Sequence, residues 1–149
     1  MAASFFAVVI GVAYLQFGAQ SDPEQVLLSH VDHELHVDEL KPGHLQHVMY
    51  SVNAQASDLP GEVIYASNCV IDGELVAHIV VRDKAHELTL LLIPQPMLNH
   101  EVTVQNARWR GVIKPHAMGN IAVLSGTDYP GNVESDAIRY SQAIKRRTI

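Results

Sequence analysis

The sequence is poor in the residues that cross-link a chain or bind nucleic acid. It has one cysteine, Cys69, so we expect neither a disulfide nor a cysteine-based zinc site within one chain. Ten acids and one base precede residue 82, and the only basic cluster is Lys145-Arg146-Arg147 near the C-terminus. A nucleic-acid-binding protein needs a concentrated basic face, so we predict that this protein binds no nucleic acid.

The sequence also lacks the short motifs of well-known enzymes. It contains no GxSxG, no HExxH, no Walker-type glycine loop and no GxGxxG. We therefore expect no enzymatic activity, no catalytic residues and no cofactor, and we rank a hydrolase last among the possible functions. Cys69 lies in a strand-like stretch and is interpreted as a small buried apolar residue, with a redox-active thiol as the alternative.

One long run of residues carries no charge. Residues 1–19 read MAASFFAVVIGVAYLQFGA, and as a helix they would span roughly 28 Å, close to the ~30 Å hydrocarbon core of a bilayer. A cleaved signal peptide would need a basic start and small residues before the cut, and Phe17 does not fit a cut after Ala19. We predict a transmembrane anchor over 1–19, in contact with the lipid bilayer, and one domain over 20–149.

The first predicted helix begins after a capping residue, Ser21 or Asp22, with Pro23 in its first turn. At about 100° of rotation per residue, its apolar side chains form one buried stripe. The stripe consists of Leu27, Leu28, Val31 and Leu35.

Three histidines of this helix fall outside the stripe. We expect His30, His33 and His36 on a polar face, together with Asp32. His30 and His36 are splayed by about 120°, which is poor geometry for a three-histidine metal site on this helix alone. The favoured interpretation is a solvated or partner-facing surface.

A second helix is predicted after the break at residues 41–43, KPG. His44 and His47 point away from its apolar stripe, so a second HxxH pair repeats the pattern of His30 and His33. The two pairs could meet across a helical hairpin and bind a metal ion, and this alternative stays open. We expect no bound metal. The apolar stripe consists of Leu45, Val48, Met49, Val52 and Ala56.

The period changes from helix-like to strand-like after residue 59. From Val63 to Ile71 the odd-numbered residues share one face of a strand, and Asp72-Gly73 is a strong hairpin signal. The run ELTLLLI is apolar on both faces, which predicts a central strand, and prolines stop it. Trp109 is interpreted as a core or edge anchor. The predicted strands are 63–71, 75–81, 87–93, 102–105, 107–114 and 120–126.

A last helix is predicted from about Asn132, its cap, to Arg147, with the basic cluster in its last turn. Its buried stripe consists of Val133, Ala137, Tyr140 and Ile144. The predicted fold is therefore α+β: an N-terminal transmembrane helix, two helices, a five- or six-stranded mostly antiparallel sheet and a C-terminal helix.

Several stretches together resemble one bacterial family. HVDHE, VNAQ, LPGEVIYASNC, AHIVV, LTLLLIP and WRGVI…GNIAVLSG are similar to conserved stretches of domain of unknown function 3379 (DUF3379). The likeness covers most of Leu28–Ile149, and residues 59–69 are its most specific piece. The resemblance implies a single-pass protein of the bacterial inner membrane whose conserved domain faces the periplasm. It also implies an anti-sigma-factor-like layout, and it supplies no catalytic residues.

The sequence departs from the family pattern at its beginning. A short cytoplasmic segment typically precedes the transmembrane helix in the family, whereas Met1 lies almost inside the apolar run. We therefore expect either a truncated or mis-started chain, or a member that has lost the ability to bind a sigma factor.

Together these observations predict a membrane-anchored periplasmic sensing or protein-interaction domain with an unidentified protein partner. It would be the remnant of an anti-sigma-factor-like regulator. The alternative is a metal-, haem- or redox-responsive module that uses His30, His33, His44 and His47, or Cys69.

Overall fold

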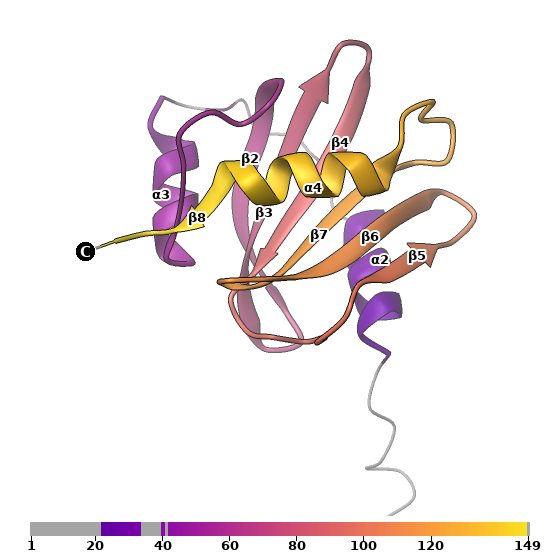
Figure 1. Cartoon of the computed structure of the whole chain (residues 1–149), viewed down its shortest axis with the longest axis horizontal. Helices are drawn as coiled ribbons and strands as arrows, with labels where there is room; N and C mark the ends of the chain where they lie inside the picture. Colours follow the sequence, from indigo (N-terminus) through magenta and orange to yellow (C-terminus); the bar gives the residue numbers. More distant parts are fainter. Residues whose placement is uncertain (1–21, 34–39, 41, 149) are drawn as a thin grey trace, which may run out of the picture.

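The structure of the protein is a computed structural model, and the residues described are 22–33, 40 and 42–148 (Figure 1). The described helices are α2 (Pro23–His33), α3 (His44–Ser51) and α4 (Val133–Ala143). The described strands are β1 (Ala54–Ala56), β2 (Glu62–Ile71), β3 (Glu74–Asp83), β4 (His86–Ile93), β5 (Val102–Gln105), β6 (Trp109–His116), β7 (Gly119–Gly126) and β8 (Ile144–Arg146). The predicted α+β class is confirmed.

Six strands form one sheet in the order β2-β3-β4-β7-β6-β5, and every neighbouring pair is antiparallel. Strand β4, which contains the run ELTLLLI, lies between β3 and β7, so its prediction as a central strand is confirmed. The prediction of five or six strands is also confirmed. A separate two-stranded sheet of β1 and β8 was not predicted.

The β2–β3 hairpin turns at Asp72 and Gly73, as predicted. Both residues have positive φ, 51° and 82°. A two-residue turn with this geometry matches the natural twist of the two strands and fixes their register. In that register Cys69 lies opposite Val76, and the pairing continues along both strands.

The predicted faces of β2 are wrong at its beginning. The register with β3 shifts between Val63 and Tyr65, because Ile64 is an extra residue that has no partner in β3. Val63 therefore packs on the same side of the sheet as Ala66, whereas Cys69 packs on the other side. A two-residue alternation cannot reveal such a bulge, because the alternation continues unbroken in the sequence.

Helices cover both faces of the sheet. In Figure 1, α4 crosses one face, and α3 lies beside it. The core on this face, here called the α3/α4 core, includes Val48, Met49, Ala77, Ile79, Val81, Leu90, Ala137 and Tyr140. Helix α2 packs on the opposite face. The core there, here called the α2 core, includes Leu27, Leu28, Val31, Val76, Leu91, Ile113 and Ala122.

Helix α3 is shorter than predicted. It ends at Ser51, and Asn53 adopts a positive φ of 56°, a conformation that commonly ends a helix. The next residues form β1, so Ala56 lies in a strand and its assignment to the helical stripe was wrong.

Helix α4 begins as predicted but ends early. The side chain of Asn132 caps it by accepting a hydrogen bond from the Ser135 backbone N–H at 2.7 Å. The helix ends at Ala143, because the following residues pair with β1 as strand β8. Lys145 and Arg146 therefore lie in a strand and do not neutralise the last turn of a helix. All four predicted stripe residues are buried: Val133, Ala137, Tyr140 and Ile144.

The predicted transmembrane anchor over 1–19 lies outside the described residues. Within the described part of the chain, no helix has the length and apolar character needed to cross a bilayer.

A polar network fastens α4 to the β3–β4 turn. Tyr129 donates a hydrogen bond from its hydroxyl to Asp136 Oδ2 at 2.7 Å. Arg139 donates to Asp136 Oδ1 at 2.9 Å and to Asp83 Oδ2 at 2.8 Å. Burial, together with the bond to Asp136, raises the pKa of Tyr129 to about 12, and burial raises the pKa of Tyr140 to about 12.

These two tyrosines predict a loss of stability in alkali. Their pKa values are higher in the folded state than in the unfolded state, where tyrosine ionises near 10. Their contribution to the free energy of unfolding should therefore be fully present below about pH 9 and be lost from about pH 10 toward pH 12. Denaturant midpoints measured across this range check the prediction.

Matched variants identify the source of this slope. Tyr140→Phe should reduce the slope, because only the contribution of Tyr129 then remains, whereas Tyr50→Phe, at an exposed position, serves as the matched control. Equal slopes in the wild-type protein and in Tyr140→Phe would contradict the assignment.

Candidate metal centre

The β2–β3 hairpin brings a cysteine and a histidine to one face of the sheet. Cys69 lies opposite Val76, and Ser67 lies opposite His78. Directly opposed residues share a face and every second residue of a strand returns to it, so Cys69 and His78 are diagonal neighbours. His78 is fully buried, with a relative exposure of 0%, and it pairs on its other side with Leu91 of β4.

Helix α2 places His30 over this pair, so the expectation that His30 faces away from the core is wrong. Val26, on the same helix, is half-buried against the α2 core beside the buried Leu27. At about 100° per residue, His30 lies about 60° from Leu27 on the side of Val26, and therefore inside the buried arc. The predicted stripe left out Val26, so its arc began at Leu27 and placed His30 outside it.

Three metal-binding side chains converge at this point. One ligand atom each of His30, Cys69 and His78 lies within 4.8 Å of the other two. The two imidazole rings have centroids 6.0 Å apart with an interplanar angle of 58°, and the Nε2 atoms of both are shielded from solvent. The ring of Tyr65 meets His78 edge-on at 5.3 Å. The arrangement is a partly shielded cluster of two imidazoles and one thiol.

The other histidines of the predicted alternative do not join this cluster. His44 and His47 are exposed on α3, which packs on the opposite face of the sheet. The structure therefore does not bring His30 together with His44 and His47. His33 is the last residue of α2, but its side chain lies outside the described part, and His36 lies outside it entirely.

A partly buried hydrogen bond holds the other side of α2 to the sheet. Trp109 donates from its indole Nε1 to Asp32 Oδ1 at 2.7 Å, and its ring packs against the α2 core. Arg108 pairs with the same carboxylate at 3.3 Å, but its side chain is largely exposed. The interpretation of Trp109 as an anchor is confirmed, and Asp32 is part of the contact between the helix and the sheet.

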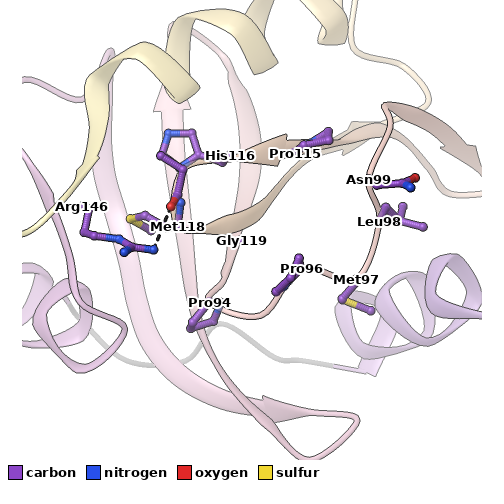
Figure 2. Close-up of a pocket in the computed structure, with 11 residues that line it drawn as sticks. Pro94, Pro96, Met97, Leu98, Asn99, Pro115, His116, Met118, Gly119 and Arg146 are labelled. Carbon is purple, nitrogen blue, oxygen red and sulfur yellow. Dashed lines mark hydrogen bonds between the residues drawn. The ribbon is translucent and has the colours of Figure 1, made fainter.

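A separate pocket of about 610 Å³ lies between the loop after β4 and the β6–β7 turn (Figure 2). Figure 2 shows His116 and Arg146 on the same side of it, near Met118. His116 Nε2 lies 3.1 Å from the Ser141 carbonyl oxygen, and Arg146 donates to the Ala117 carbonyl oxygen at 2.9 Å. The pocket otherwise presents mainly proline and apolar side chains: Pro94, Pro96, Met97, Leu98 and Pro115.

Close backbone packing borders this pocket. The buried side chain of Asn120 accepts hydrogen bonds from the backbone N–H groups of Met97 at 2.5 Å and Leu98 at 3.1 Å. A Cβ on Gly119 would lie 2.2 Å from the Ile93 carbonyl oxygen, so only glycine fits there. The pocket brings together no set of metal-binding or nucleophilic side chains.

Sequence reasoning missed His78 as a member of a site. The signal was present, because the two-residue turn at Asp72-Gly73 fixes which residues of the hairpin share a face. Counting outward from that turn places His78 on the face of Cys69. The contribution of His30 depends on how α2 docks, which the hairpin alone does not determine.

The chain matches the model of one protein family, described as a protein of unknown function (DUF3379), over residues 1–139. The match begins earlier than the sequence resemblance, at residue 1, and so includes the apolar segment. None of the curated proteins and none of the solved structures matches the chain.

We expect Asp32→Ala to loosen α2. The variant removes the acceptor of the Trp109 indole N–H, which should lower the free energy of unfolding by about 1–2 kcal/mol and speed amide exchange in α2. A double-mutant cycle with Trp109→Phe separates this bond from other effects, because the second substitution should add less in the absence of Asp32. Fully additive effects, or unchanged exchange in α2, would contradict the assignment.

Proposed function

This chain belongs to the DUF3379 family of proteins of unknown function, and from that premise we propose that it is a sensing and protein-interaction domain at a bacterial inner membrane. Residues 1–19 would span the bilayer once, and residues 20–149 would lie in the periplasm. The observation that carries the proposal is the position of α2. This helix follows the apolar segment closely and covers the cluster of His30, Cys69 and His78.

The tether is supported by the composition of residues 1–19 and by the extent of the family match. The segment carries no charge, and the match to the family begins at residue 1. The apolar run therefore belongs to the same family unit as the folded domain. On insertion scales, apolar side chains favour the bilayer, whereas one arginine near the centre costs about 2.5–3.5 kcal/mol.

A sensing role is supported by the two attachments of α2. One is the hydrogen bond between Asp32 and Trp109, and the other is the contact of His30 with the face of Cys69 and His78. A ligand that binds at the second attachment would change how firmly α2 is held to the sheet. In sequence only residues 20–22 separate α2 from the apolar segment. A change in how α2 is held would therefore act directly on the residues that join the domain to the apolar segment.

A protein partner is supported by the exposed end of the β2–β3 hairpin. Val70 and Leu75 face each other across the two strands and are 65% and 42% exposed. Strand β2 is also an edge strand of the sheet. Exposed apolar pairs and unpaired strand edges are features that proteins use for contacts with other chains. An anti-sigma-factor-like regulator would receive its periplasmic signal through such a surface.

A metal-, haem- or redox-responsive module remains the second candidate, because the structure gathers three ligand side chains. Within this alternative, the thiol of Cys69 donates a hydrogen bond to the Val76 carbonyl oxygen at 3.7 Å. That contact uses the protonated thiol, whereas redox chemistry and metal binding both use the thiolate, so it does not separate the two. The two imidazoles beside Cys69 favour metal binding over a redox-active thiol, because they complete a ligand set.

Fractionation tests the tether and its orientation. The full chain, produced in a Gram-negative bacterium with a C-terminal epitope tag, should sediment with membranes, resist a carbonate wash and dissolve in detergent. Protease added to intact spheroplasts should remove the tag and leave a cytoplasmic marker uncut.

One substitution provides the matched control. Ile10→Arg, near the middle of the apolar run, should move much of the chain out of the membrane fraction. Recovery of the unprocessed wild-type chain in the aqueous fraction would refute the tether. A tag that is cut only after lysis would refute the periplasmic orientation.

A further inference from the structure

We propose that His30, Cys69 and His78 bind one d¹⁰ metal ion, copper(I) in preference to zinc(II), between α2 and the β2–β3 hairpin. The inference deepens the proposed sensing function, because it names the metal ion as the stimulus. The biological role of the metal site rests on that function, whereas metal binding itself does not. It replaces the sequence-based expectation of no bound metal, which assumed that His30 faced solvent. The single cysteine is sufficient here because two histidines complete the ligand set.

The donor atoms select the class of metal. A thiolate sulfur and two imidazole nitrogens suit copper(I) and zinc(II), whereas calcium and magnesium require oxygen ligands. On binding, Cys69 would lose its thiol proton to solvent as the bond from Sγ to the metal forms. His30 and His78 would bind as neutral imidazoles, each through one ring nitrogen, and no electron transfer is involved.

The spacing of the donor atoms is close to that of a bound site. They lie within 4.8 Å of one another. With metal–nitrogen bonds of about 2.0–2.1 Å and a metal–sulfur bond of about 2.3 Å, bound donors are separated by roughly 3.5 Å. The cluster must therefore contract by at most about 1.3 Å. His78 is fixed in the sheet interior, so His30 and Cys69, both partly exposed, would make most of this movement.

Charge balance favours copper(I). One thiolate and two neutral imidazoles make copper(I) a neutral centre, whereas zinc(II) keeps one positive charge. The sheet side of the site is largely apolar, since Val76 and Leu91, which pair with Cys69 and His78, are fully buried. A net charge is costly in such surroundings unless a further anionic ligand compensates it.

The bound ion would join three elements that are far apart in sequence. His30 comes from α2, Cys69 from β2 and His78 from β3. An ion that binds the folded state and not the unfolded state raises the melting temperature. Because it bridges α2 to the hairpin, it should also slow amide exchange in α2 more than in α4.

Metal binding is tested with the purified full chain in detergent micelles under anaerobic reducing conditions. Competition with a chromophoric chelator measures copper(I) affinity, and a separate titration measures zinc(II) affinity. We expect one copper(I) per chain, a weaker zinc(II) complex and slower exchange in α2. Cobalt(II) serves as a spectroscopic probe, because a thiolate-to-cobalt charge-transfer band reports bonding to Cys69 in the unmodified protein.

Variants separate this site from other histidines. Cys69→Ser and His30→Gln should each weaken copper(I) binding by about 100-fold or more, since second-shell losses alone weaken metal sites by about 10–100-fold. The double variant His44→Gln/His47→Gln is the matched control, because it removes an exposed HxxH pair from α3 and should bind normally.

The outcomes are separable from those of the fractionation experiment, which does not involve metal. Absence of the thiolate–cobalt band, or of saturable binding at one ion per chain, would overturn the site. Equal loss of affinity in the His44/His47 double variant would also overturn it. Zinc(II) binding tighter than copper(I) binding would confirm the ligand set and overturn the preference derived from charge balance.

Discussion

The register fixed by the Asp72-Gly73 turn is the constraint on which the rest of the structure depends. Both turn residues have positive φ, so the strands on either side can pair in only one way. A slip of β3 by one residue would turn His78 to the face of α3 and α4, away from Cys69, and would bring Ile79 and Val81 out of the α3/α4 core. The two cores and the candidate metal centre therefore depend on the same two residues.

Much of the sheet could be predicted, because its signals are local. Each of three features can be recognised from a few consecutive residues: the turn at Asp72-Gly73, the run of β4 that is apolar on both faces, and the prolines after it. The Asn132 cap is equally local, since it depends only on a side chain and the first turn of α4. The positions of these elements could be predicted from neighbouring residues, because tertiary contacts did not change the local structure there.

The errors arose where distant parts of the chain decide the outcome. Residues 144–146 are extended because they pair with β1. No residue near them in sequence indicates this distant pairing. The bulge at Ile64 changes the face of Val63 without changing the pattern of apolar residues. The candidate site combines both situations: Cys69 and His78 follow from the hairpin, whereas His30 joins them only through the docking of α2.

The pairing of β1 with β8 sets an order in which the domain can be completed. Strand β8 lies almost at the C-terminal end, and it supplies Ile144 to the α3/α4 core. The residues that make the β2–β3 hairpin and its contact with α2 are all synthesised much earlier. The metal-binding face can thus assemble before β8 is synthesised, whereas the layer that contains α3 must wait for β8.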